Sequence, residues 1–127
     1  MEKSVIDELK AAAKAASERS YSPYSGFAVG AAALTDAGMF CGANVENASY
    51  GATMCAERVA LFKGISEGAK KVLALAVYAG PSLPYPCGMC LQALSEFTAA
   101  DAPVFLTSEA ESHTYLFKEL FPHPFKG

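Results

Sequence analysis

Two short stretches decide the fold of this chain: T-M-C-A-E-R at residues 53–58 and P-C-G-M-C at residues 86–90. The first places a thiol two residues before a carboxylate at the head of a helix. The second is a C-x-x-C that opens another helix, directly after a proline-rich loop at residues 80–86. Helix N-termini offer free backbone amides and a favourable dipole, which lower the pKa of a thiol. Both stretches are therefore expected to present thiolates at a helix tip.

Cys55, Cys87 and Cys90 from these two helix starts can hold one zinc ion in tetrahedral geometry. Three protein ligands leave the fourth position open, which is the arrangement of a catalytic zinc site. Two other interpretations compete with this one: a redox-active C-x-x-C, and a closed structural site completed by Cys41. A redox pair would not explain the C-A-E sequence at residues 55–57.

Composition and charge limit the classes of partner. A hydrophobic fraction of 52% with 18% charged residues is high for 127 residues, so we expect apolar surface to be buried between subunits. The net charge of -3 and the lack of a basic cluster argue against nucleic acid. The chain shows neither a signal peptide nor an apolar run near the ~20 residues of a membrane span. We expect one domain over residues 1–127, located in the cytoplasm, with its cysteines reduced.

Patterns of apolar residues predict an α/β order of elements. A helical period covers residues 4–18, with Ser4 as the N-cap. The other expected elements are strands at 27–35 and 39–47, a helix at 53–67, a strand at 72–78, a helix at 90–99, a strand at 103–107, and a mixed strand and helical turn at 115–121. The first two strands form a hairpin with a glycine of positive φ in its turn. The order predicts a mixed sheet between helical layers, with parallel crossovers through the two motif helices.

Residue spacing also assigns side chains to faces. In the strand at 39–47, Asn44 and Glu46 share one face and Cys41 lies on the other. Cys41 is therefore expected to be a buried small hydrophobe and not a metal ligand. The apolar side of the helix at 53–67 is expected to consist of Val59, Leu61, Phe62 and Ile65.

The motifs together resemble the small homotetrameric cytidine deaminases. The resemblance rests on C-A-E-R at residues 55–58 and P-C-x-x-C at 86–90, preceded by N-V-E-N-A-S-Y-G at 44–51, and it extends from Y-S-P-Y-S at 21–25 to Phe125. It implies a three-layer α/β/α fold with a five-stranded mixed sheet, one zinc ion per subunit held by the three cysteines, and hydrolytic deamination of cytidine and 2′-deoxycytidine in pyrimidine salvage. One departure is Leu91, where family members commonly have Arg.

The resemblance also assigns roles near the metal. Glu57 is implied as the proton shuttle, and Arg58 as the cation that hydrogen-bonds to ligand sulfurs. Cys55 and Glu57 are about 200° apart on an ideal helix. They can converge only if the site lies past the helix end. The alternatives without a role at the metal are that Glu57 is a solvated residue of the first helical turn and that Arg58 lies on the surface.

Substrate recognition is implied at a second set of positions. By resemblance, Asn44 and Glu46 hydrogen-bond the ribose hydroxyls and Phe27 packs against the pyrimidine ring. The loop that carries Ala48, Tyr50 and Gly51, together with Phe125, would contribute to the pocket of a neighbouring subunit. Two other functions share parts of the motifs: a deaminase of modified cytosine nucleosides of the blasticidin type, and a non-catalytic zinc-stabilised interaction module.

Overall fold

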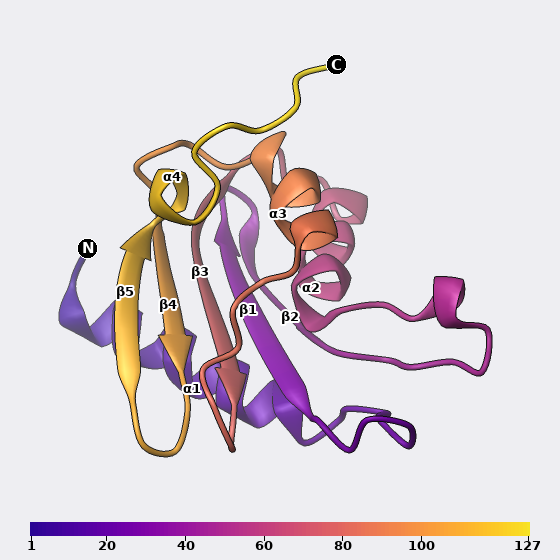
Figure 1. Cartoon of the computed structure of the whole chain (residues 1–127). Helices are drawn as coiled ribbons and strands as arrows, with labels where there is room; N and C mark the ends of the chain where they lie inside the picture. The colour runs from indigo at the N-terminus through magenta and orange to yellow at the C-terminus, as the bar shows by residue number, and fades with distance from the viewer.

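The structure is a computed structural model that describes all residues from Met1 to Gly127. Five strands form one sheet in the order β2-β1-β3-β4-β5 (Figure 1). The strands are β1 Val29–Thr35, β2 Gly38–Ala43, β3 Val72–Ala79, β4 Pro103–Thr107 and β5 Ser112–Leu116. The helices are α1 Lys3–Ser17, α2 Ala56–Ser66, α3 Gly88–Ser95 and α4 Phe117–Leu120, with a short 3-10 helix η1 at Tyr50–Ala52.

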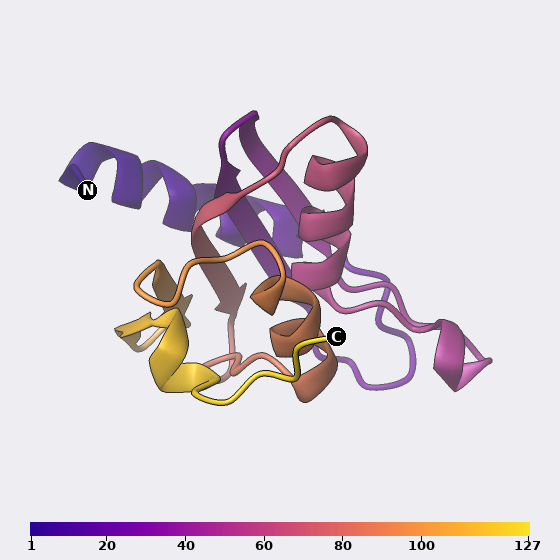
Figure 2. The same cartoon turned by 90° about the horizontal axis from the view of Figure 1, so that it is seen from above.

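The sheet lies between two helical layers, as the resemblance implied. Helix α1 covers one face, where Leu9 and Ala13 pack with Ala32 and Ala76 of the sheet. Helices α2, α3 and α4 lie on the other face, and a second apolar cluster fills the space beneath them. Figure 2 shows α1 on one side of the strands and α3 and α4 on the other. The three-layer α/β/α fold with a five-stranded mixed sheet is confirmed.

Both crossovers join strands that run in the same direction. Strands β3 and β4 are adjacent and parallel, and α3 connects them. Strand β1 pairs antiparallel with both β2 and β3, so β2 and β3 run the same way with β1 between them. Helix α2 therefore crosses over β1 on its way from β2 to β3. This arrangement brings the first turns of α2 and α3 to the same end of the sheet.

Two glycines allow this packing. Gly38 ends the β1–β2 turn with φ of 119°, the positive angle expected of the hairpin glycine. Gly42 lies under α2, where a Cβ atom would come within 2.6 Å of the backbone nitrogen of Ala60. The helix thus rests directly on the backbone of β2, which fixes the position of its N-terminus.

Several expected boundaries are wrong. Helix α1 begins at Lys3 with Glu2 as its N-cap, because the amides of Val5 and Ile6 bond to the carbonyl of Glu2; Ser4 is inside the first turn. Helix α2 begins at Ala56 and not at residue 53. The amide and carbonyl of Met54 are instead both hydrogen-bonded to Val45, each at 2.9 Å, so this stretch is extended.

The apolar face of α2 matches the expected one only in part: Leu61 is in the core and Ile65 packs against it, as predicted. Apart from Leu61, the buried residues of α2 without a charge are small, since the helix packs closely on β2: they are Ala56, Ala60 and Gly64. Phe62 is 46% exposed, so its predicted core position is wrong.

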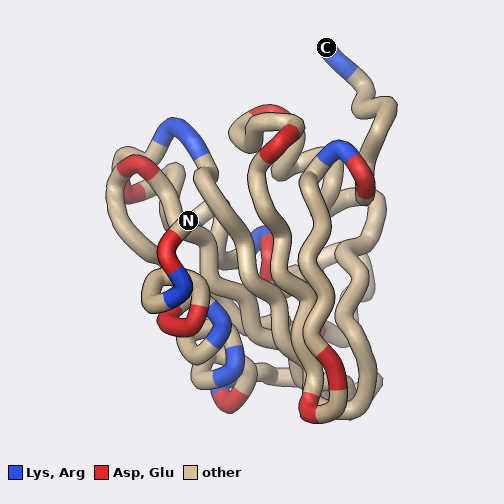
Figure 3. The backbone as a smooth tube through the Cα atoms, turned by 90° about the vertical axis from the view of Figure 1, so that its left-hand side faces the viewer, with Lys and Arg blue, Asp and Glu red and all other residues tan.

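Charged residues of both signs are interspersed along α1 (Figure 3).

Strand β2 ends earlier than the expected residue 47. It stops at Ala43, and the chain then leaves the sheet as an arm that returns at Met54. This arm, residues 44–54, carries η1 at its tip and projects from the body (Figure 1). No helix of the chain combines the length and apolar character that a membrane span needs.

Candidate metal centre and active site

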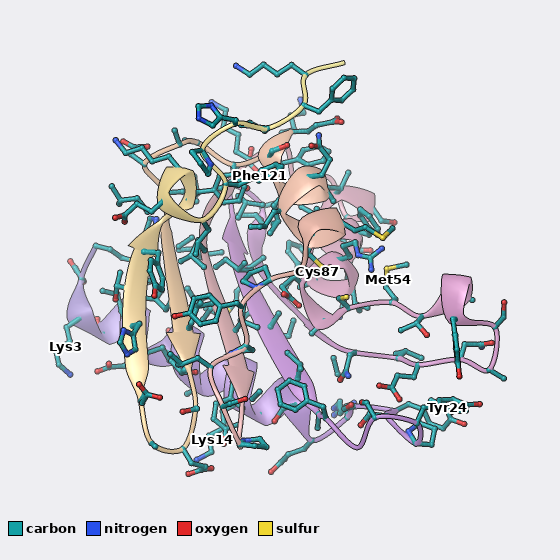
Figure 4. The ribbon with its side chains drawn as sticks, viewed as in Figure 1. Lys3, Lys14, Tyr24, Met54, Cys87 and Phe121 are labelled. Atoms are coloured by element: carbon teal, nitrogen blue, oxygen red, sulfur yellow. The ribbon has the colours of Figure 1, made fainter.

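The tips of α2 and α3 bring three thiols together. Cys55 is the N-cap of α2 and Cys87 is the N-cap of α3, while Cys90 lies in the first turn of α3 and is fully buried. The Sγ atoms of Cys55 and Cys87 are 3.8 Å apart, and those of Cys87 and Cys90 are 3.5 Å apart. Figure 4 shows Cys87 at the start of α3, facing the start of α2. The predicted convergence of the two motifs is confirmed.

These distances fit a zinc ion. With Zn–S bonds of about 2.3 Å, tetrahedral geometry separates two sulfurs by about 3.8 Å. All three sulfurs lie within 4.8 Å of one another, and no fourth His, Cys, Asp or Glu joins the group. Cys41 is not part of it: its side chain packs on the α1 side of the sheet, as its place in β2 predicted. The donor set is therefore an open three-sulfur metal site, and the closed site with Cys41 is excluded.

Arg58 compensates the negative charge of the sulfurs. Its Nη2 donates a hydrogen bond of 3.3 Å to Cys55 Sγ, and the residue is buried. Burial lowers the pKa of the guanidinium, but hydrogen bonds with Cys55 and Cys90 outweigh this and raise it. The hydrogen bond from Cys90, together with Arg58, lowers the pKa of Cys55 to about 5 despite partial burial. Cys55 is therefore a thiolate at neutral pH, and the surface reading of Arg58 is wrong.

Glu57 is enclosed beside the cluster. It occupies the second position of α2 and is only 5% exposed. Burial, with a further contribution from the negative Cys55, raises the pKa of Glu57 to about 7. On an ideal helix Cys55 and Glu57 would lie about 200° apart. They can nevertheless face the same cavity, because Cys55 is the N-cap and lies outside the helix, so both side chains meet beyond the helix end. A carboxyl group with a pKa near neutrality can both accept and donate a proton.

One cavity of about 280 Å³ joins the thiols to part of the predicted recognition set. Its walls include the three residues Phe27, Asn44 and Glu46 together with Cys55, Glu57 and Cys87. Three larger grooves lie elsewhere: one beside α1 and β2, one beside the start of β3, and one beside the C-terminal residues 124–127. None of them is lined by Glu57 or by a thiol of the cluster, so the smaller cavity is the one that contains the reactive groups.

Hydrogen bonds from the chain hold Asn44 and Glu46 in fixed orientations. Asn44 donates from Nδ2 to the carbonyl of Phe27 at 2.8 Å, and its Oδ1 accepts from the amide of Val29 at 3.0 Å. Glu46 accepts from the amides of Tyr24 and Ser25 and from the Ser25 hydroxyl. These bonds, above all the one from the Ser25 hydroxyl, lower the pKa of Glu46. Its carboxylate is therefore charged at neutral pH.

The other predicted recognition residues do not line this cavity. Ala48, Tyr50 and Gly51 are on the exposed arm, and Tyr50 is 81% exposed. Phe125 is 76% exposed near the C-terminus. Its backbone is nevertheless held by Gln92 of α3, whose carboxamide accepts from the Phe125 amide at 3.2 Å and donates to the Phe125 carbonyl at 2.9 Å. The structure thus separates the predicted set into a cavity group and a projecting group.

Sequence reasoning assigned no role to seven residues of the cavity wall: Ser25, Val29, Thr53, Met54, Ala56, Pro84 and Tyr85. Tyr85 lies two positions before Cys87, so its nearness to a ligand could have drawn attention to it. It also missed the pairing of Gln92 with Phe125, for which the sequence gives no signal because the partners are far apart in the chain. Leu91, the departure from the family pattern, packs half-buried against the core beneath α2 and α3.

A three-layer fold that carries an open three-thiolate zinc site and a buried carboxyl group beside it defines the class of zinc-dependent hydrolases that act on amino groups of heterocycles. Residues 3–106 match the family model described as the cytidine and deoxycytidylate deaminase zinc-binding region. The chain belongs to this family, whose cofactor is zinc.

Relatives of known name agree with the family. The chain is 48% identical over 113 residues to cytidine deaminase of Halalkalibacterium halodurans, covering 87% of this chain and 86% of that protein. It is 46% identical over 105 residues to cytidine deaminase of Sporosarcina psychrophila, covering 81% and 77%. The solved structure of cytidine deaminase from Burkholderia pseudomallei superposes with a TM-score of 0.88 at 40% identity, covering 98% of this chain and 100% of that one.

Proposed function

We propose that the chain catalyses the hydrolysis of cytidine and 2′-deoxycytidine to uridine and 2′-deoxyuridine with release of ammonia. The observation that carries this proposal is Glu57, a buried carboxyl group with a pKa near 7 that faces the same cavity as Cys55 and Cys87. Water adds to the ring carbon that bears the amino group, and the bond from this carbon to nitrogen then breaks. The names of the relatives support cytidine as the substrate.

Cys55, Cys87 and Cys90 would hold the zinc ion, one per subunit. When bound, zinc acts as a Lewis acid that makes water a stronger nucleophile near neutral pH. The chain's own contribution is to keep three thiolates in place and to balance their charge with Arg58. Withdrawal of electron density from the sulfurs by Arg58 preserves the acidity of the metal.

Glu57 would move the protons of the reaction. It takes a proton from the attacking water and passes it to the ring nitrogen next to the reacting carbon. It then takes the second proton from the hydroxyl group added to that carbon and gives it to the amino group, which leaves as ammonia while the carbonyl forms. A carboxyl group with an ordinary pKa would be a poor donor at pH 7, whereas the raised pKa of Glu57 matches both directions of transfer. The burial of Glu57 therefore contributes to its function, because burial is what raises its pKa.

The nucleoside would bind with its sugar toward Asn44 and Glu46 and its base against Phe27. Glu46 Oε2 accepts from the Ser25 hydroxyl and retains a lone pair for a ribose hydroxyl, and the second proton of Asn44 Nδ2 is free to be donated. Because the chain already fixes both side chains, substrate binding costs little further ordering. The ring of Phe27 supplies a flat apolar wall for the pyrimidine.

Ala48, Tyr50, Gly51 and Phe125 would complete the site of a neighbouring subunit in a homotetramer. Two observations support this: Tyr50 and Phe125 are among the most exposed large apolar side chains, and neither lines its own cavity. Exposed aromatic residues of this kind are typical of interaction surfaces. The high apolar fraction of the sequence has the same explanation.

The wider setting follows from the chemistry. We propose that residues 1–127 form one catalytic domain that acts in pyrimidine salvage in the cytoplasm, with free nucleosides and not nucleic acid as substrates. Four free cysteines support a reducing compartment, because oxidation of the three clustered thiols would remove the metal ligands.

The test compares wild type with Glu57→Gln for zinc content and for ammonia release from cytidine. The amide cannot shuttle protons, so kcat should fall by about 10³-fold or more while zinc remains at one per chain. The matched control is Glu67→Gln, the same change at the exposed C-terminal end of α2, which should leave kcat within about twofold.

Each alternative has its own outcome in this experiment. Retained turnover in Glu57→Gln rejects the proton shuttle. A wild type that binds zinc but releases no ammonia from cytidine rejects the proposed substrate, and activity on a modified cytosine nucleoside alone would identify the blasticidin type. No activity on either nucleoside would leave a non-catalytic zinc module.

A further inference from the structure

A proline-rich strap forms one wall of the cavity. Residues 80–87 follow β3 and run back over the sheet to α3 (Figure 1). Pro84 and Tyr85 in this strap line the cavity beside Cys87. The strap contains three prolines in the six positions from Pro81 to Pro86, and proline has no backbone N–H. The strap therefore cannot be fixed by a ladder of backbone hydrogen bonds. Its first residue is tied by one such bond, from the amide of Glu109 to the carbonyl of Gly80 at 3.2 Å, and side-chain contacts hold the rest.

Tyr85 holds the middle of the strap by reaching to the far edge of the sheet. Its hydroxyl is 2.7 Å from the hydroxyl of Tyr115 on β5. The two rings also meet edge to face, with centroids 5.9 Å apart and planes at 61°. Such ring pairs stabilise beyond the area that they bury. Tyr115 itself is fixed, because its strand pairs with β4 opposite Val104.

The Tyr115 hydroxyl stays protonated at neutral pH. The hydrogen bond with Tyr85 raises the pKa of Tyr115 above its usual value, and the nearby Glu119 and Glu111 raise it further. The hydroxyl of Tyr115 therefore remains available for its hydrogen bond with Tyr85 at neutral pH. Nothing in the proton transfers assigned to Glu57 requires either tyrosine.

We propose that Tyr115 is a positioning residue for substrate binding: through Tyr85 it fixes the strap as the cavity wall against which the nucleoside lies. This inference rests on the proposed function and adds a residue from β5, an edge strand of the sheet. A strap that lost this contact would sample positions that narrow or widen the cavity. The bound conformation would then be populated only part of the time, which raises KM more than it lowers kcat.

The test is steady-state kinetics on cytidine for Tyr115→Phe and Tyr85→Phe, each of which keeps the ring and removes one hydroxyl. Loss of one hydrogen bond should raise KM by about three- to tenfold, with kcat within about twofold and zinc content unchanged. The double variant should be no worse than either single variant, because all three lack the same hydrogen bond.

The matched control is Tyr78→Phe. The Tyr78 hydroxyl is also hydrogen-bonded, to Glu109, but it packs with α1 on the opposite face of the sheet. This change should lower Tm and leave KM for cytidine unchanged. If Tyr115→Phe behaves in the same way, the tyrosine pair is merely structural and the proposal is overturned.

The proposed function is tested separately by the wild type in the same assay. Turnover by wild type with an unchanged KM in Tyr115→Phe overturns the positioning role alone. Absence of turnover in wild type overturns the proposed function, and the variants are then compared by the dissociation constant for cytidine in calorimetry. There the same three- to tenfold weakening is expected, and equal or absent binding contradicts the positioning role.

Discussion

The site has a metal end, which contains Cys90, Glu57 and Arg58, and a proposed recognition end, which contains Tyr50 and Phe125. The two ends differ in how far one chain encloses their side chains. At the metal end, Cys90 is fully buried, Glu57 is nearly so, and Arg58 bonds to a sulfur of the same helix tip. At the recognition end, Tyr50 and Phe125 extend into solvent from an arm and a tail. The reactive groups are thus enclosed within one chain, whereas the aromatic side chains of the proposed recognition end are uncovered in it.

This difference has an energetic reason. Thiolates and a carboxyl group with a shifted pKa need a dry, fixed environment, which the interior of one chain provides. Exposed aromatic side chains gain free energy only when they are covered, so their contribution depends on assembly. We therefore expect substitutions at the metal end to act on every molecule alike, and substitutions at the recognition end to act through substrate affinity and subunit association.

The largest expected effect is that of Cys90→Ala. Removal of the buried ligand should reduce bound zinc to a small fraction of one per chain and abolish measurable turnover, and it should lower Tm because metal binding is coupled to folding. Zinc analysis and thermal unfolding check this. The control is Cys41→Ala, which removes a thiol outside the cluster and should retain zinc. Full zinc content in Cys90→Ala would show that the three sulfurs are not the ligands.

Phe125→Ala should have a smaller effect, confined to recognition. Loss of a covered aromatic side chain is worth about 1.5–3 kcal/mol, which corresponds to about ten- to hundredfold in kcat/KM for cytidine. Zinc content should not change. Kinetics together with the oligomeric state by light scattering separate a lost substrate contact from a lost subunit contact. If neither kcat/KM nor the oligomeric state changes, Phe125 contacts neither the substrate nor a neighbouring subunit.

Gln92→Leu tests whether the position of Phe125, and not only its presence, matters for recognition. The leucine keeps a similar volume on α3 but cannot make the two hydrogen bonds that hold the backbone of Phe125. Gln92→Leu should lower kcat/KM for cytidine, as Phe125→Ala does, but by a smaller factor. In the Phe125→Ala background, Gln92→Leu should cause no further loss. An additive effect in the double variant would mean that Gln92 acts on something other than Phe125.

The smallest effect is expected at Ser25. Its amide and hydroxyl help to lower the pKa of Glu46, so their contribution to stability is present above the usual pKa of a glutamate and is lost as the pH falls through the lowered value. Ser25→Ala should therefore lower Tm slightly at pH 7, and the difference from wild type should shrink toward pH 3. Thermal unfolding at both pH values checks the sign. A difference that grows in acid would contradict it.

Local sequence determined most of the metal end. C-A-E-R and P-C-x-x-C each specify a helix start and its side chains within a few residues, so the positions of the thiols and of Glu57 follow once the two tips meet. The alternation of strands and helices likewise predicted the layered fold. Boundaries were less predictable: the extended backbone at Met54 depends on hydrogen bonds to Val45, which periodicity does not encode.

Only the tertiary structure decided the rest. It placed β1 between β2 and β3, turned Phe62 outward, joined Tyr85 to Tyr115 and joined Gln92 to Phe125. The physical reason is the range of the interactions. Helix caps and apolar periods act between neighbours in the chain, whereas contacts between residues about thirty positions apart depend on which faces the whole packing brings together.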